Sequence, residues 1–272
     1  MSVINTNVNA LFAQSALRVN NRALSTAMEQ LSTGSRINSA KDDAAGVAIA
    51  STMTSQIRGL SQAVRNVNDG VSLLQTAEGA MIEQTNMLQR MRELAMQAST
   101  DTVSTEQKTY LNKEYTALKS QITQITTGTQ WNGDNILDGS GGNAGVYSIA
   151  VDPNGGNTID VTIASMTPLT ASLGTISTSA DATTALGNID AALTTINGSR
   201  SEIGAGINRL NYAADNMNNV IQNATASRSQ VLDTDYATAT TQLARSQIIQ
   251  QAATAMLAQA NQQPQTVLAL LK

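Results

Sequence analysis

The sequence predicts a mainly α-helical protein: a long antiparallel helical rod, built as a coiled-coil bundle, with a small β-hairpin region. Three observations predict this class. Apolar residues recur at intervals of three and four in both terminal parts of the chain, which is the spacing of a coiled-coil seam. Glycines gather between residues 128 and 206, so helices are interrupted mainly in the middle. Aromatic residues make up only 3% of the chain, which suits helix seams better than a thick globular core.

Each terminal part of the chain carries a seam of its own. Near the start, a leucine recurs every seven residues, at Leu17, Leu24 and Leu31. Near the end, the seam runs through Ile249, Ala253, Met256, Val267 and Leu271. A single packed bundle uses the same stripes, so the spacing alone does not distinguish a single bundle from a polymer. The many heptads at both ends favour helices that pair with each other and with copies of the same chain.

The stretches inside these seams continue the pattern. The first runs through Ile57, Leu60, Val64, Val67, Val71 and Leu74, and the second through Leu111, Tyr115, Leu118, Ile122 and Ile125. A third runs from Ile203 to Val231, with Arg228 as its one polar break. We therefore expect long helices here, one of them over about residues 42–99, with a length of ~85 Å.

Local signals place the helix ends. Gly34 suits the left-handed position that ends a first helix. Ser39 and Asp42 have the spacing of a capping box, and Asp42 and Asp43 would add favourable charge to the first turn of the next helix. Ser104 and Gln107 form a second capping box, opening a helix that should end near Gly128.

The middle of the chain predicts one hairpin. Apolar residues alternate over Tyr147, Ile149 and Val151, and again over Ile159, Val161 and Ile163. The DPNGGN sequence at residues 152–157 is typical of a tight turn between two strands. From residue 166 to about residue 183 the sequence is rich in Ser, Thr and Ala without a clear period. We expect that stretch to be an exposed connector.

Several functions are excluded by composition. The chain has no Cys and no His, which removes disulfides, thiol and imidazole catalysis and the usual zinc ligands. We therefore expect no enzyme, no metal and no cofactor. The net charge of −4 argues against nucleic acid as the main partner. No run approaches the ~18 apolar residues of a membrane span, and residues 1–8 do not resemble a cleavable signal peptide.

Two long terminal motifs are specific. The segment LSTGSRINSAKDDAAG at residues 31–46 resembles the N-terminal signature of bacterial flagellins, and LARSQIIQQAATAMLAQANQQPQTVL at residues 243–268 resembles their C-terminal signature. The start, MSVINTNVNAL, is also similar to that family. The resemblance covers roughly residues 1–140 and 185–272, and the short middle is similar to a flagellin that lacks large outer domains.

The resemblance implies a domain plan and a function. Residues 1–41 would be an N-terminal core-lining helix that pairs with a C-terminal one at 232–272. Residues 42–140 and 185–231 would form the two halves of a rod domain, and residues 141–184 would hold the hairpin and a short variable connector. The implied function is to polymerise into the extracellular flagellar filament for swimming. Type III export without a cleaved leader, an export chaperone, and cap and hook-junction proteins would accompany it.

A receptor-recognition patch is also implied by the resemblance. Animal Toll-like receptor 5 recognises flagellins through a patch that Gln89, Arg90, Glu93, Leu94 and Glu114 match in this sequence. Arg90, Leu94 and Glu114 would be the central contacts. The same surface would pack against neighbouring subunits, which we take as its native role.

Two alternatives remain open. The first is a cell-surface binding protein or adhesin derived from the same fold, which the scarcity of aromatic residues for sugar stacking weakens. The second is a hook–filament junction protein. The close match through residues 262–268 favours the filament subunit itself.

Overall fold

The computed structural model describes the backbone of residues 6–270 and the side chains of residues 6–262. Its helices are α1 (Val8–Thr33), α2 (Ala44–Ser99), α3 (Thr105–Gly128), α4 (Thr167–Ser172), α5 (Ser179–Leu232) and α6 (Tyr236–Leu270). Its strands are β1 (Gln130–Trp131), β2 (Asp134–Asn135), β3 (Val146–Ala150) and β4 (Thr158–Thr162). The predicted mainly α class with a small hairpin region is confirmed. Two compact units result, one of residues 1–55 with 223–272 and one of residues 56–222.

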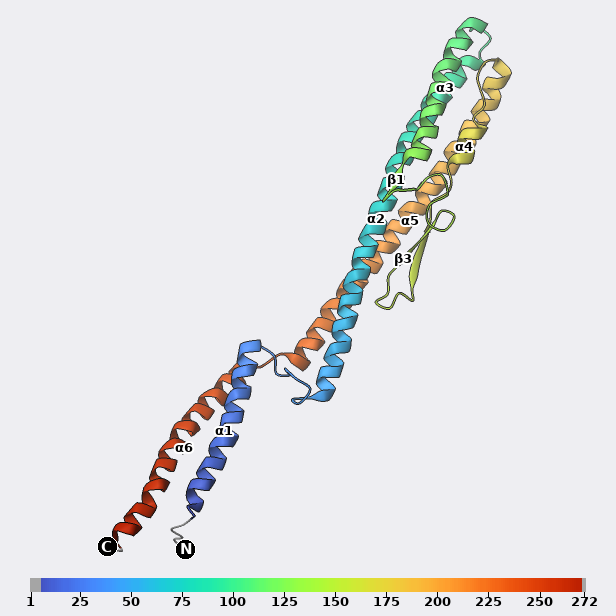
Figure 1. The fold of residues 1–272 in the computed structure, drawn as a ribbon. Coiled ribbons are helices and arrows are strands. Elements are labelled where there is room, and N and C mark those ends of the chain that lie inside the picture. The colour runs from blue at the N-terminus through green and yellow to red at the C-terminus, as the bar shows by residue number, and fades with distance from the viewer. Residues whose placement is uncertain (1–5, 271–272) are drawn as a thin grey trace. The chain divides into compact units, whose positions relative to one another are not determined.

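The first unit contains the antiparallel pair of α1 and α6, which lie side by side in Figure 1. Two polar residues of the N-terminal part form hydrogen bonds with α6. Asn7 Nδ2 donates to the carbonyl oxygen of Ala260 at 2.7 Å, and Asn20 Nδ2 donates to that of Ser246 at 2.8 Å. Asn20 is 7% exposed, so this is a polar residue inside the seam, which in coiled coils specifies register.

The residues that pack between α1 and α6 keep heptad spacing. On α1 they are Ala10, Ala13, Leu17, Asn20, Leu24, Ala27 and Leu31, and on α6 they are Ala239, Leu243, Ser246, Gln250, Ala253, Leu257 and Ala260. The expected seam position of Ala253 agrees with this stripe. Ile249 and Met256 lie outside it, with 40% and 66% of their surface exposed.

Two short segments join the pair to α2 and α5. Gly34 ends α1 in the left-handed conformation (φ 70°), as expected. The capping box at Ser39 was wrong, because α2 begins at Ala44 and Asp43 caps it, its Oδ1 accepting from the Gly46 N–H at 2.9 Å. Asp42 lies before the helix and instead accepts from the N–H and hydroxyl groups of Ser39.

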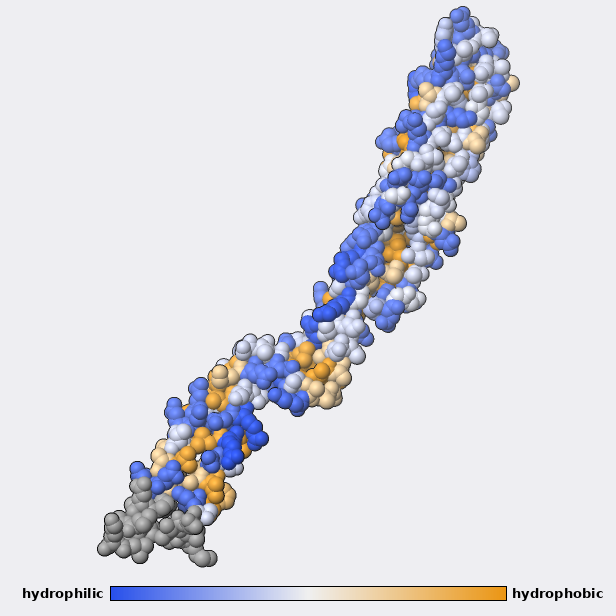
Figure 2. All heavy atoms as spheres, viewed as in Figure 1, coloured by the Kyte–Doolittle hydropathy of each residue, from blue (hydrophilic) through white to orange (hydrophobic). Residues whose placement is uncertain are grey.

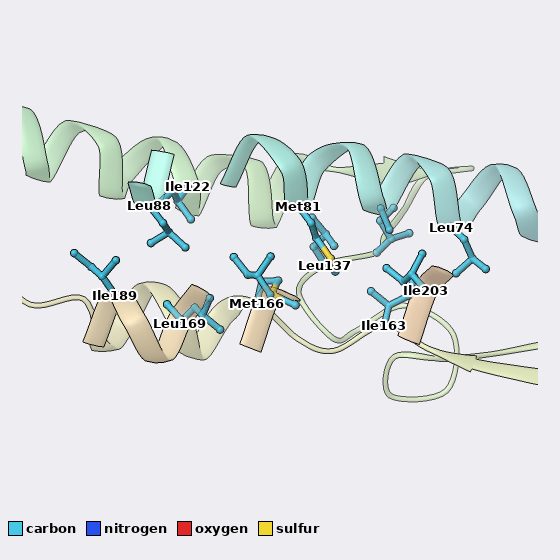
Figure 3. Close-up of a cluster of buried hydrophobic side chains, with 14 of the residues drawn as sticks. Leu74, Met81, Leu88, Ile122, Leu137, Ile163, Met166, Leu169, Ile189 and Ile203 are labelled. Atoms are coloured by element: carbon cyan, nitrogen blue, oxygen red, sulfur yellow. The ribbon is translucent and has the colours of Figure 1, made fainter. Parts of the chain in front are cut away.

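The second unit is a bundle of α2, α3 and α5 with α4 packed against it (Figure 1). Buried residues of all four helices meet in one continuous apolar core, part of which is drawn in Figure 3. Leu74, Met81 and Leu88 of α2 supply one side of it, and Ile189 and Ile203 of α5 face them. The predicted second capping box is present at the start of α3, between Ser104 and Gln107.

The predicted hairpin is confirmed, with Tyr147 opposite Val161 and Ile149 opposite Ile159. Its inward side chains sit over helix glycines, because an added Cβ at Gly70 would lie 2.4 Å from Ile149 Cδ1. A Cβ at Gly206 would lie 2.9 Å from Val161 Cγ1. The β1–β2 hairpin was not expected; its turn is built from Asn132 and Gly133, both with positive φ.

The expected exposed connector was wrong. Residues 167–172 form α4, and α5 already begins at Ser179. Met166, Leu173, Ile176 and Ala182 are at most 1% exposed. The large apolar residues of this Ser/Thr-rich stretch are widely spaced and show no visible period, yet they enter the core.

Candidate functional site

A charged cluster joins α2 to α3 on the surface of the second unit. Arg90 Nε and Nη2 donate to Glu114 Oε1 at 3.0 and 2.9 Å, and Nη1 donates to Glu93 Oε2 at 2.8 Å. Hydrogen bonds to Glu93 and Glu114 raise the pKa of Arg90, so the guanidinium stays charged. The side chains are about half exposed, and such surface pairs contribute little to stability. The cluster therefore contributes little to holding the fold.

The structure brings most of the predicted recognition residues together but not Leu94. Gln89, Arg90, Glu93 and Glu114 are exposed. Leu94 is 2% exposed and belongs to the apolar core. Leu94 therefore does not share the exposed face of Arg90, although the sequence led us to expect both on one helix face. Its spacing of four from Arg90 suggested a shared face, but the long Arg90 side chain reaches outward while the leucine points inward.

Two residues beside this cluster were missed by sequence reasoning. Arg92 and Met96 line an open depression together with Gln89 and Glu93. Arg92 Nε donates to Asp190 Oδ1 of α5 at 2.9 Å, and Met96 is 50% exposed. Positions 89, 92, 93 and 96 follow helical spacing, which could have pointed to one shared face.

The α1–α6 pair presents an apolar surface to solvent. Nine of the fifteen large apolar residues exposed in the described part of the chain lie on these two helices: Val8, Leu11, Phe12, Val19, Met28, Tyr236, Ile248, Ile249 and Met256. Figure 2 shows apolar residues on the visible surface of this unit. Exposed apolar residues concentrated on one pair of helices are typical of an interaction site.

Two neighbouring grooves run between α1 and α6. Phe12, Ala16 and Met256 line the first, and Phe12, Val19 and Ile249 line the second. Phe12 is 72% exposed. We call Phe12, Val19, Ile249 and Met256 the open stripe, since they face solvent beside the seam.

The remaining predicted seam residues divide into two groups. Leu17, Leu24, Leu31 and Ala253 are half-buried between α1 and α6. The side chain of Val267 and the whole of Leu271 lie outside the described residues. Within those residues, no helix is both long and apolar enough to cross a membrane, and no cluster of three or more metal-ligating side chains occurs.

Comparison with known proteins decides the family. Residues 4–141 match the bacterial flagellin N-terminal helical region, and residues 186–271 match the bacterial flagellin C-terminal helical region. The chain is 41% identical over 274 residues to a flagellin of Halalkalibacterium halodurans, covering 99% of this chain and 100% of that protein. This chain belongs to the bacterial flagellin family. It is thus a structural subunit rather than an enzyme.

Other relatives support the same conclusion. Flagellin A of Vibrio cholerae is 33% identical over 375 residues, with 99% of each chain covered. The crystal structure of Bacillus cereus flagellin matches with a TM-score of 0.52 at 32% identity, covering 56% of this chain and 88% of that one. A putative flagellar hook-associated protein from Vibrio parahaemolyticus shares the fold at 14% identity (TM-score 0.62).

The family fixes the function in outline. This flagellin polymerises with copies of itself into the extracellular flagellar filament. The adhesin and junction-protein alternatives are not favoured.

Proposed function

We propose that this flagellin assembles chiefly through the open stripe of the α1–α6 pair. The observation that carries the proposal is the concentration of exposed large apolar residues on these two helices. Burying one such side chain is worth about 1.5–3 kcal/mol, so a neighbour that covers the stripe would gain a large part of the subunit contact energy. The half-buried seam residues Leu17, Leu24 and Leu31 would hold the pair that presents the stripe.

The free chain should order its α1–α6 pair only when it assembles. The α1–α6 pair places much of its apolar surface in solvent, and most helical stability in proteins comes from tertiary packing of an apolar face. We expect residues 8–33 to be weakly protected from amide exchange before assembly and strongly protected in the filament. Strong protection of α1 in the free chain would contradict deferred ordering.

Seeded polymerisation tests the stripe directly. Phe12→Ser and Met256→Ser should each slow filament growth from wild-type seeds at least tenfold, because each removes apolar contact area. The matched control is Gln14→Ser, at an exposed polar position on the same helix, and it should grow normally. Growth of both stripe variants at the control rate would refute the proposal.

We further propose that the Arg90–Glu114 cluster is a contact between neighbouring subunits, and that animal Toll-like receptor 5 recognises it on the free subunit. The exposed, prearranged guanidinium and carboxylates support this. Gln89 and Glu93 would extend the contact, and the Met96 depression beside them would add apolar area.

Two variants separate these roles. Arg90→Ala and Glu114→Ala should weaken both filament growth and binding to purified receptor ectodomain. Arg65→Ala is the control, since Arg65 is an exposed α2 arginine whose guanidinium donates to Gln62 of the same helix. Unchanged receptor affinity in both variants would remove the receptor proposal, and unchanged growth would remove the subunit-contact proposal.

The export route and the accessory partners complete the proposal. We infer export by the flagellar type III apparatus without cleavage of a leader, assisted by a chaperone and followed by contacts with cap and hook-junction proteins. Family membership and the absence of cysteine, which excludes disulfides before export, support the route. Mass spectrometry of subunits from native filaments should find the N-terminal segment intact, and a missing segment would contradict the route.

A further inference from the structure

The two segments that join the helices of the first unit meet each other. Ser35 and Asp233 form an isolated antiparallel bridge. Across it, the Arg36 N–H donates to the Leu232 carbonyl oxygen at 2.6 Å, and the Thr234 N–H donates to that of Gly34 at 2.9 Å. Each segment thus satisfies a backbone group of the other.

Arg36 also closes the end of α5. The last carbonyl groups of a helix have no partner within the helix, and α5 carries no basic residue in its last turn. The Arg36 side chain supplies one from the other segment, because Nη2 donates to the Val231 carbonyl oxygen at 2.8 Å. One residue therefore caps α5 with both its backbone N–H and its guanidinium, and a cation is favourable at this end of a helix.

Other contacts tie both segments to the same point. Gln30 Nε2 of α1 donates to the Arg36 carbonyl oxygen at 3.0 Å. On the other side, the Ser229 hydroxyl donates to the Asp233 carboxylate. Tyr236, the first residue of α6, packs against Gly34. A Cβ added at Gly34 would lie 3.2 Å from the Tyr236 hydroxyl oxygen. The ends of α1, α5 and α6 are thus linked around Arg36.

We propose that Arg36 is a clasp that makes the two joining segments open and close as one cooperative unit. The N-terminal segment has some hydrogen bonds of its own, from Asn38 to Ser35 and to Asp42. The hydrogen bonds described above that connect it with the end of α5 and the C-terminal segment all start or end at Gly34 or Arg36. When the clasp opens, the two bridge hydrogen bonds and the α5 cap are lost together. A partner that pulls the C-terminal segment away would release the N-terminal one, and the reverse holds by linkage.

Amide exchange of the full-length chain tests the clasp at two positions, the N–H groups of residues 36 and 234. In the wild type both should exchange with the same protection factor, because one opening event exposes both. Arg36→Gln should lower both factors by about tenfold, the effect of losing a charge-assisted hydrogen bond. Asp233→Ala acts on the opposite segment and should also lower protection at position 36. The matched control is Arg22→Gln, since the exposed Arg22 makes no side-chain bond within the described residues.

The outcomes are decisive in either direction. If Arg36→Gln lowered the protection factor at position 36 but not at position 234, the two segments would open independently, and the proposal would be overturned. Unchanged protection factors at both positions would overturn it as well. If the Arg22→Gln control lowered both protection factors equally, the decrease would come from the change in net charge, and the proposal would also be overturned. If the free chain protects neither amide, the comparison is made in filaments where the isotope-labelled variant is a minority among wild-type copies, so that assembly does not depend on it.

Discussion

The hydroxyl of Tyr115 donates to the carbonyl oxygen of Leu173 at 2.6 Å, and neither residue has any exposed surface. This bond belongs to a polar stripe on α3 that holds the extended segment between α4 and α5. Asn112 Oδ1 accepts from the Ile176 N–H at 3.0 Å, and Lys108 Nζ donates to the Ser179 hydroxyl at 2.5 Å. The stripe recognises mostly backbone groups, so the sequence of the held segment shows little sign of it.

Alkaline pH should weaken this attachment. Burial raises the pKa of Tyr115 to about 12, above the ~10 of an unfolded tyrosine. The protonated phenol therefore stabilises the fold fully below pH 10, and that contribution is lost as pH rises from about 10 to 12. The loss should amount to about 2–3 kcal/mol of the free energy of unfolding, measured by denaturant titration of the second unit at several pH values.

The matched variants isolate this titration. Tyr115→Phe should be less stable than wild type by about 1–3 kcal/mol at pH 7, because the Leu173 carbonyl group loses its buried partner. The difference between the two should shrink between pH 10 and 12. Tyr110→Phe, at a 59% exposed tyrosine of the same helix, should follow the wild-type curve. A constant difference between wild type and Tyr115→Phe across this range would count against the assignment.

The sequence was informative where the signal is local or periodic. Ser104 with Gln107 and the left-handed Gly34 fixed helix ends, since caps depend on neighbours in the chain. The spacing on α6 did not separate the two stripes that this helix carries. The smaller residues, such as Ala239 and Ser246, face α1, while Ile249 and Met256 stay open. Which stripe faces the partner within the chain depends on close helix packing, and hydrophobic spacing alone does not determine it.

Contacts between distant parts of the sequence explain the other differences between the predictions and the structure. The segment from residue 166 to residue 183 enters the core because α3 binds its backbone, a contact between positions about sixty residues apart along the chain. Leu94 was placed on the surface because motif similarity says nothing about burial. Only the packing of α3 and α5 over α2 decides which positions of α2 remain open.

Two glycines of α5 provide a matched test of hairpin docking. Gly206→Ala should destabilise the second unit by about 1–3 kcal/mol, because its Cβ would come within 2.9 Å of Val161 Cγ1. Gly204→Ala should instead stabilise it by about 0.5–1 kcal/mol, since its Cβ meets nothing within 4 Å and alanine favours the helix. Thermal unfolding of both variants measures the contrast. Equal stabilisation by both would mean that the hairpin does not rest on Gly206.

The start of α2 allows a second contrast between neighbours. Asp43→Ala should cost about 0.5–2 kcal/mol, because the Gly46 N–H loses its capping acceptor. Asp42→Ala leaves that cap in place and removes only hydrogen bonds within the joining segment. Amide exchange at Gly46 distinguishes them: it should accelerate in the first variant and not in the second. Faster exchange in both would show that the joining segment, rather than Asp43 alone, begins the helix.

Asn20 offers a test of how α1 and α6 find their register. Its amide is buried and bonded to the Ser246 carbonyl oxygen, which costs stability relative to an apolar residue but penalises shifted pairings. Asn20→Leu should therefore raise the stability of the α1–α6 pair while allowing shifted or intermolecular pairing. Asn20→Ala, which adds no apolar bulk, should weaken the pair without creating new pairings. In filaments where the labelled chain is a minority among unlabelled copies, spin labels at Ala13 and Ala253, on facing seam stripes, would report one distance in wild type and a broadened distribution in Asn20→Leu. A single unchanged distance in that variant would assign the register to the apolar seam and to Asn7 instead.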